Sequence, residues 1–196
     1  MLYSYHLSMY SDFNFDTALR KGNDLMKNGK NPVIGFYIIF SINVGLRVSD
    51  VLKLKYSDLL DKKENDILCI EEKKTKKVRN ITLNGHVINS YVSLIEYLKS
   101  KGLFDPEGFI FVSQKRTVYS NRSLNRILKT VFDNVKLSIS THSLRKSFGR
   151  RVYDNCKQSE HSLVLLSDIF RHTSTSITRK YLGLRQEEIG NVYLSL

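Results

Sequence analysis

Apolar residues recur at helical spacing in the first part of the chain. In residues 14–28 this spacing predicts a helix, with Asp12 or Asn14 as its N-terminal cap. The next apolar segment, residues 33–44, follows an Asn-Pro pair that suits a helix start and is apolar on nearly every side. This segment is therefore predicted to be a central buried helix, which Gly45 ends.

Later segments alternate between strand-like and helix-like patterns. The stretches "DILCIE" at 66–71 and "KVRNITL" at 77–83 predict two strands around the basic turn "KKTK", and "FIFVS" predicts a short strand or an extended segment. Further helices are predicted over 86–100, about 121–135, 142–155, 160–170, 174–182 and 186–194. The pattern as a whole indicates a mainly α fold with one small antiparallel β-sheet, which is an α+β class.

Composition limits the type of protein. The 196 residues suit a single domain, and the hydrophobic fraction of 41% is sufficient for a core. No apolar run reaches the ~18 residues of a membrane span, and the N-terminus lacks the features of a signal peptide. Cys69 and Cys156 belong to no metal-binding pattern. We therefore expect a cytoplasmic protein that binds no membrane and no structural metal.

Charge points to the kind of partner. Lys and Arg number 31 against 19 Asp and Glu, and the net charge of +12 favours a polyanion such as nucleic acid. Acidic residues are absent between Glu107 and Asp133 and again between Asp133 and Asp154, whereas basic residues are frequent there. This segregation predicts a basic face. The side chains expected to contact DNA are Lys73, Lys76, Lys77, Lys115, Arg116, Arg122, Arg126 and Lys146.

The first candidate for chemistry is Arg47 in "NVGLRVSD". It directly precedes a short expected helix, for which Ser49 is the predicted cap. An arginine beside the backbone N–H groups of a helix start suits a phosphate oxygen. The alternative is a surface arginine paired with Asp50, and these residues alone do not separate the two interpretations.

The second candidate is the lysine-rich turn in "EEKKTKKVRNITL". Its members Lys73, Lys74, Lys76 and Lys77 repel one another unless the turn is solvated or faces an anion. A solvated hairpin tip is the commoner explanation for such a turn.

The third candidate is "THSLRKSFGRR", where His142 and Arg145 share one face of a helix that Thr141 is expected to cap. Both side chains could bind the same anion. The alternative is a satisfied histidine at a helix start, with the arginine in an ion pair.

The fourth candidate is "IFRHTSTSITRKYLG", in which Tyr181 follows His172 by nine residues. A tyrosine is mostly protonated at neutral pH, so it needs a base or nearby cations to act as a nucleophile. Arg179, Lys180 and His172 are expected to provide such a field. The alternative is an amphipathic tyrosine packed on the core.

Taken in order, these patterns resemble the catalytic domain of the tyrosine recombinases, also called the phage integrase family. The resemblance runs from about residue 12 to the C-terminus. It rests on three boxes, "GLRVSDVLKLKYSDL", "HSLRKSF" and "RHTSTSITRKYLG", and the gap from His172 to Tyr181 matches the family spacing.

The resemblance implies a role for each side chain in DNA cleavage. Tyr181 would attack a DNA phosphodiester and form a 3′-phosphotyrosyl link. Arg47 and Arg145 would hold the non-bridging oxygens, and His172 would add a hydrogen bond to the same phosphate. No metal, ATP or other cofactor is then needed.

The resemblance also implies two groups for proton transfer. His142 would assist proton transfer at the tyrosine, and a hairpin lysine would protonate the leaving 5′ oxygen. Lys74 is preferred because the family's lysine often precedes Thr in this turn, while Lys73 and Lys76 stay open as alternatives.

Three positions depart from the family pattern. Arg171 stands where a glycine is usual, Lys146 where a histidine is common, and Thr82 where a proline is common. None of these differences removes an expected catalytic group.

Length suggests a catalytic-domain-only form, with an N-terminal extension at 1–11 and one catalytic domain at 12–196. The implied partner is double-stranded DNA, with a monomer or weak oligomer off DNA and a tetramer on paired sites, and an accessory DNA-binding protein is a candidate partner. The tail helix in 184–196 is expected to exchange between protomers, or else to dock on its own domain. A type IB topoisomerase and a catalytically silent DNA-binding regulator are the competing functions.

Overall fold

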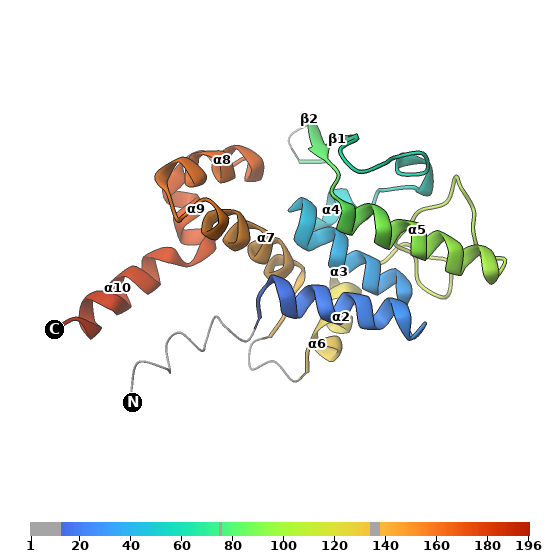
Figure 1. Ribbon diagram of the computed structural model, residues 1–196, viewed down its shortest axis with the longest axis horizontal. Coiled ribbons are helices and arrows are strands. Elements are labelled where there is room, and N and C mark those ends of the chain that lie inside the picture. The colour runs from blue at the N-terminus through green and yellow to red at the C-terminus, as the bar shows by residue number, and fades with distance from the viewer. Residues whose placement is uncertain (1–12, 75, 134–137) are drawn as a thin grey trace.

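The chain folds into a helical body with one small sheet at its edge (Figure 1). The structure is a computed structural model that describes residues 13–74, 76–133 and 138–196. The expected extension at 1–11 lies outside the described residues. The mainly α fold with a small antiparallel sheet is confirmed.

The first two described helices pack against each other, and the second of them lies at the centre of the fold. Helix α2 (Phe15–Lys27) is capped by Asn14, and α3 (Pro32–Val44) carries its proline in the first turn. Nearly every residue of α3 is buried, as its apolar pattern predicted. It packs against α2, α5 (Gly85–Ser100) and α7 (Thr141–Asn155).

The later helices agree with the predicted segments to within a few residues. They are α5 (Gly85–Ser100), α6 (Asn121–Val131), α7 (Thr141–Asn155), α8 (Glu160–Phe170), α9 (Thr175–Leu182) and α10 (Leu184–Leu194). Helix α6 ends earlier than expected, because residues 132–133 form a turn, and residues 134–135 lie outside the described residues. No helix among the described residues is long and apolar enough to cross a bilayer.

The sheet is a two-stranded antiparallel hairpin. Strand β1 (Ile67–Glu71) pairs with β2 (Val78–Thr82), and Glu71 lies opposite Val78 at the end next to the lysine-rich turn. The "FIFVS" segment is extended: its Phe109 forms an isolated bridge with Lys55. A 3₁₀ turn, η1 (Tyr56–Asp58), precedes the hairpin.

Two predicted caps are wrong by one or two residues. Helix α4 (Val48–Val51) starts after Arg47, so Ser49 lies inside it and its hydroxyl contacts the Asp50 carboxylate instead. Helix α7 is capped by Ser140, and the neighbouring Thr141 is its first residue. Because α4 is a single turn, its dipole adds little to the binding of an anion at Arg47, and the phosphate contact of Arg47 stays a prediction.

The C-terminal helices have a small core of their own. Residues Phe170 of α8 and Leu182 of α9 are fully buried in it, and Tyr181 packs at its edge. Gly149 lets α7 come close, since a Cβ there would lie 2.7 Å from Leu182 and 2.8 Å from Phe170. This close packing fixes α8 and α9, which carry the His-to-Tyr box, against α7.

Candidate active site

Two arginines from separate elements meet at one main-chain oxygen. Arg47, which follows the α3 C-terminus, donates to the Phe170 carbonyl at 3.1 Å, and Arg145 of α7 donates to the same oxygen at 3.2 Å. The Arg145 guanidinium also stacks on the Phe170 ring, 4.7 Å from its centroid. The end of α8 therefore gathers the two expected arginines.

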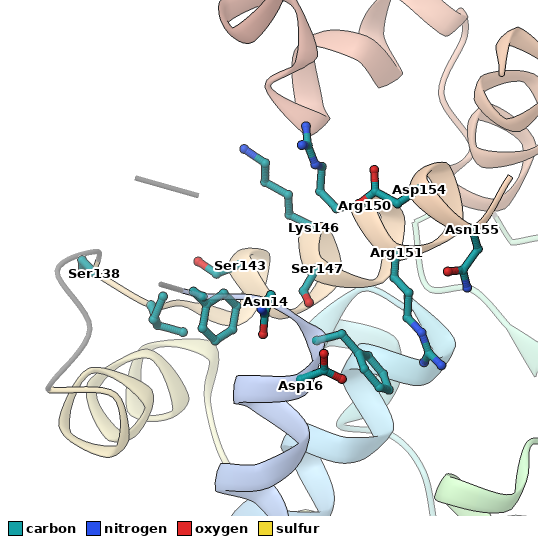
Figure 2. Close-up of a pocket in the computed structure, with 13 residues that line it drawn as sticks. Asn14, Asp16, Ser138, Ser143, Lys146, Ser147, Arg150, Arg151, Asp154 and Asn155 are labelled. Atoms are coloured by element: carbon teal, nitrogen blue, oxygen red, sulfur yellow. The ribbon is translucent and has the colours of Figure 1, made fainter. Parts of the chain in front are cut away.

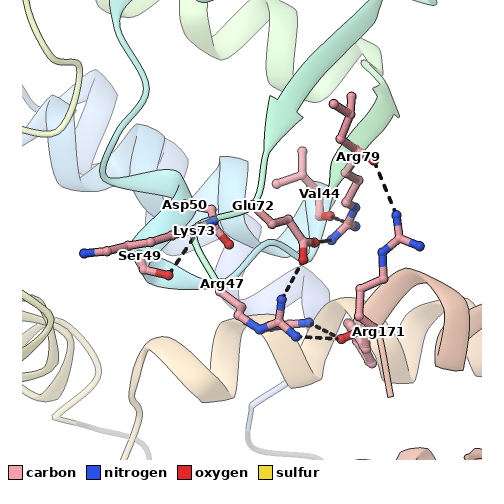
Figure 3. A network of polar contacts seen from close by, with 11 residues as sticks. Val44, Arg47, Ser49, Asp50, Glu72, Lys73, Arg79 and Arg171 are labelled. Atoms are coloured by element: carbon pink, nitrogen blue, oxygen red, sulfur yellow. Dashed lines mark hydrogen bonds and ion pairs between the residues drawn. The ribbon is translucent and has the colours of Figure 1, made fainter. Parts of the chain in front are cut away.

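A buried carboxylate holds the first of these arginines. Glu72, which is 1% exposed, pairs with Arg47 at 2.8 Å and with Arg79 at 3.6 Å (Figure 3). Arg79 also donates to the Val44 carbonyl at 2.9 Å. The alternative pairing of Arg47 with Asp50 is wrong: Arg47 pairs with Glu72, and the Asp50 carboxylate accepts the Lys73 main-chain N–H at 2.8 Å. The local patterns did not indicate Glu72, whose partners are distant in sequence.

The buried cluster carries more positive than negative charge. The pKa of Arg145 is lowered to about 10, chiefly by burial and also by the nearby Arg47 and Arg79, while Tyr181 and Glu72 act in the opposite direction. Burial likewise lowers the pKa of Arg79. The Arg145 Nε is buried without a hydrogen-bond partner among the described residues. A site with three guanidinium groups, one carboxylate and a buried N–H that has no acceptor is suited to an anion.

The side chain of Tyr181 lies beside this cluster. Its ring packs edge-on against Phe170 at 5.2 Å and against His172 at 5.4 Å between centroids. The hydroxyl donates a long hydrogen bond of 3.5 Å to the main-chain carbonyl of His142. The tyrosine and both arginines thus surround the same residue, Phe170.

Burial decides the protonation of this tyrosine. It raises the pKa of Tyr181, whereas Arg145 and Arg47 lower it by a smaller amount. The expected cationic field therefore comes from these two arginines and not from Arg179, whose guanidinium pairs with Glu160. A phenol of this kind is protonated at neutral pH and needs a proton acceptor to become a nucleophile.

A buried hydroxyl orients His172. Its Nδ1 lies 3.0 Å from the Oγ1 of Thr178, which is fully buried, and its main-chain N–H donates to the Ser167 carbonyl at 2.9 Å. Burial lowers the pKa of His172, and Arg145 and Arg47 lower it further. The imidazole is therefore held in place and favoured in its neutral form.

The other two expected catalytic side chains are exposed. His142 lies in the first turn of α7, and Lys74 lies on the hairpin turn. Two main-chain hydrogen bonds close that turn. The Glu72 N–H donates to the Lys77 carbonyl at 3.1 Å, and the Lys76 N–H donates to the Glu72 carbonyl at 2.9 Å. In the described parts of the chain, no hydrogen bond or ion pair joins Lys74 to the arginines, His172 or Tyr181.

The expected DNA-contacting residues lie in separate places. Lys73, Lys76 and Lys77 are exposed on the hairpin turn, as are Lys115 and Arg116 on the tight turn 113–117. Arg122 and Arg126 are exposed one turn apart on α6, which lies across the molecule from the hairpin in Figure 1. The basic residues are thus spread over several elements, and a single basic face stays a prediction.

Lys146 is half-buried and lines a cavity of about 690 Å³ between the start of α2 and α7, which has both polar and apolar lining residues (Figure 2). Arg150 and Asp154 line the same cavity, which does not include Tyr181. No group of three or more His, Cys, Asp or Glu in the described part of the chain is arranged to hold a metal ion.

Comparison with known proteins gives a consistent result. The family model described as the phage integrase family matches residues 25–188. The chain is 33% identical over 166 residues to the probable integrase/recombinase YoeC of Bacillus subtilis, covering 84% of both chains. It is 25% identical over 186 residues to the tyrosine recombinase XerH of Campylobacter jejuni, covering 91% of this chain but 50% of XerH.

Solved structures share the fold. The XerA recombinase superposes with a TM-score of 0.67 at 19% identity, covering 93% of this chain and 62% of XerA. A XerH recombinase bound to a palindromic difH substrate gives a TM-score of 0.65 at 21% identity, covering 92% of this chain and 52% of that one. Against several of these proteins, the chain spans about half of the relative's length.

Proposed function

Because the chain belongs to the phage integrase family of tyrosine recombinases, we propose that it breaks and rejoins double-stranded DNA at specific sites, with Tyr181 as the nucleophile. The observation that carries the proposal is the convergence of Arg47, Arg145, His172 and Tyr181 around Phe170. These are the residue types that attack on a phosphodiester needs: a nucleophile beside cationic and neutral hydrogen-bond donors.

The proposed step exchanges one phosphoester bond for another. The Tyr181 oxygen attacks phosphorus, the bond to the 5′ oxygen breaks, and a 3′-phosphotyrosyl link forms. Arg47 and Arg145 hold the non-bridging oxygens, on which negative charge grows, and each such donor contributes about 10²–10³-fold to the rate. His172 donates a hydrogen bond to the same phosphate. The energy of the phosphodiester is kept in the new link, so rejoining reverses the step.

Two proton transfers accompany this exchange. The phenol proton of Tyr181 must leave, since burial keeps the hydroxyl protonated, and His142 is the proposed acceptor. The 5′ oxygen must gain a proton, and Lys74 is the proposed donor from the hairpin turn. The exposure of Lys74 suits a group that approaches the phosphate only when DNA lies across the turn.

Binding to DNA would involve the basic residues outside the site. Lys73, Lys76, Lys77, Lys115, Arg116, Arg122, Arg126 and Lys146 are proposed to contact phosphates. Their spread over several elements suits a duplex that runs past the hairpin, the 113–117 turn and α6. Two solved relatives bear on this: the XerH structure contains a difH substrate, and a lambda integrase dimer is bound to a COC′ core site.

Helix α10 supports assembly with a second copy. It projects from the body in Figure 1, and its Ile189, Val192 and Tyr193 are 42%, 60% and 75% exposed. A helix docked on its own domain would bury such residues. We therefore propose that 184–196 packs on a neighbouring protomer in a tetramer on paired DNA sites.

A covalent-capture experiment separates the competing functions. The probe is a nicked suicide duplex, selected by this protein from a random-sequence pool, in which a short 5′ fragment diffuses away after cleavage. A recombinase forms an adduct that survives denaturation and transfers the strand to a second duplex of the same site. A regulator forms none, and a topoisomerase relaxes supercoiled plasmid without preferring the selected site.

A further inference from the structure

Arg171 has a backbone conformation that L side chains disfavour. It caps the C-terminus of α8 with φ 55°, in the left-handed region. Glycine adopts this conformation without steric cost, so the backbone alone gives no reason for a side chain here. The guanidinium, however, reaches the hairpin: its Nη2 donates to the Val78 carbonyl at 3.4 Å (Figure 3).

Both neighbours of Arg171 in the chain belong to the candidate active site. The Phe170 carbonyl before it accepts from Arg47 and Arg145, and His172 after it presents its imidazole beside Tyr181. The main chain at this corner is therefore fixed by the site. The hydrogen bond from the Arg171 side chain therefore connects the hairpin to the main chain of the candidate active site.

Val78 is the first residue of β2 after the lysine-rich turn, and it pairs with Glu71 at the end of β1. The residues that precede this turn, Glu72 and Lys73, are also held by polar contacts. The Glu72 carboxylate binds Arg47 at 2.8 Å, and the Lys73 N–H binds the Asp50 carboxylate at 2.8 Å. Lys74 thus lies on a turn that is held at one end by these contacts and at the other end by Arg171.

We propose that Arg171 is a positioning residue that tethers the hairpin to the His172 corner and so sets where Lys74 meets the leaving 5′ oxygen. This inference rests on the proposed function. Arg171 acts here through the hairpin and not by touching the phosphate, so its loss should affect protonation of the leaving group and leave phosphate binding intact.

The substitution Arg171→Gly isolates the tether, because it removes the bond to Val78 while relieving the left-handed backbone. Folding stability should therefore be unchanged or higher, whereas cleavage of the nicked suicide duplex should slow on the order of 10–100-fold, part of the roughly 10²–10⁴-fold that a placed general acid contributes. Arg171→Lys keeps one donor and should recover part of the rate.

A chemically altered duplex tells a positioning role from a general structural one. When sulfur replaces the bridging 5′ oxygen, the leaving thiolate needs no proton, so the rate no longer depends on the general acid. Arg171→Gly should then cleave at nearly the wild-type rate, as should Lys74→Ala. Lys157→Gly is the matched control: Lys157 is also cationic and left-handed, with φ 53°, and its loss should change neither rate.

Equal slowing of Arg171→Gly on both duplexes, or no slowing on either, would overturn the inference. A second readout does not depend on activity: amide hydrogen exchange at residues 76–80 should be faster in Arg171→Gly than in wild type or Lys157→Gly. Unchanged exchange also contradicts the tether. If the wild-type protein forms no adduct, the proposed function fails, while the exchange measurement still decides whether Arg171 holds the hairpin.

Discussion

Arg47 and Arg145 donate to one oxygen atom, the carbonyl of Phe170, although they come from different elements. Two guanidinium groups repel each other at this range, so they meet only because the backbone and Glu72 hold them there. A phosphate between them would relieve the repulsion. The carbonyl therefore marks the place where the two arginines can share an anion.

Arginine geometry at this place should matter more than its charge. Arg145→Lys keeps a cation but loses the planar pair of donors, and cleavage should fall by about 10²–10³-fold. Single-turnover cleavage of the nicked suicide duplex measures this. Arg20→Lys, on the exposed face of α2, serves as the control. A rate for Arg145→Lys within a few-fold of wild type would contradict the assignment.

The buried carboxylate should be essential for stability. Glu72→Gln leaves Arg47 and Arg79 without a counter-charge, and breaking a buried ion pair typically costs about 3–5 kcal/mol. Glu71→Gln is the matched control on the same hairpin: its carboxylate is 63% exposed and pairs with Lys76 at 3.9 Å, which is worth about 0–1 kcal/mol. Urea denaturation compares the two. Equal losses would show that Glu72 is not the counter-ion of the site.

Gly45, which ends α3 two residues before Arg47, should be required for the stability of this corner. It ends α3 with φ 59°, and a Cβ there would lie 2.3 Å from the Phe148 ring. Gly45→Ala should therefore cost about 1–2 kcal/mol for the left-handed backbone and about 1–3 kcal/mol more for overpacking. Gly102→Ala tests the backbone term alone, since Gly102 has φ 64° and open space around it. Thermal denaturation should show Gly45→Ala as clearly the less stable variant.

How much the sequence reveals differs between the helices and the site. The pattern of apolar residues predicted α8 and α3 closely. The side chains that these helices bury are set by their own sequences, on one face of α8 and on nearly all sides of α3. Cap positions were less certain, since Ser140 and Thr141 are adjacent and both can accept the same N–H.

Long-range contacts could not be predicted from local patterns. The partner of Arg47 is Glu72, which directly follows β1 and lies 25 residues further along the chain, and no periodicity or spacing links the two. Arg171 likewise appeared only as a departure from the family's glycine. The structure accounts for both the glycine and the arginine: the position is left-handed, and the side chain reaches Val78.

His172 should titrate below its ordinary pKa of 6.5, because burial, Arg145 and Arg47 all lower it. Below that pH the unfolded chain binds more protons than the folded one, so this contribution to stability is complete above pH 6.5 and is lost as the pH falls. His172→Gln should lose less stability than wild type between about pH 7 and pH 5.

Bound DNA should reverse the shift of His172, since a phosphate favours the charged imidazole. Imidazole titration by NMR measures the pKa of His172 with and without the duplex, on Tyr181→Phe protein so that the DNA is not cleaved. A pKa at or above 6.5 in the free protein would contradict the buried, cationic surroundings seen for this side chain.

The most direct test of the whole account is the identity of the residue bound to DNA. Wild-type protein is incubated with the nicked suicide duplex and digested with protease, and the DNA-linked peptide is identified by mass spectrometry. The account predicts a 3′-phosphotyrosyl link at Tyr181, lost in Tyr181→Phe and kept in Tyr97→Phe, which changes a half-buried tyrosine of α5. An adduct that persists in Tyr181→Phe, or one attached to another residue, would contradict it.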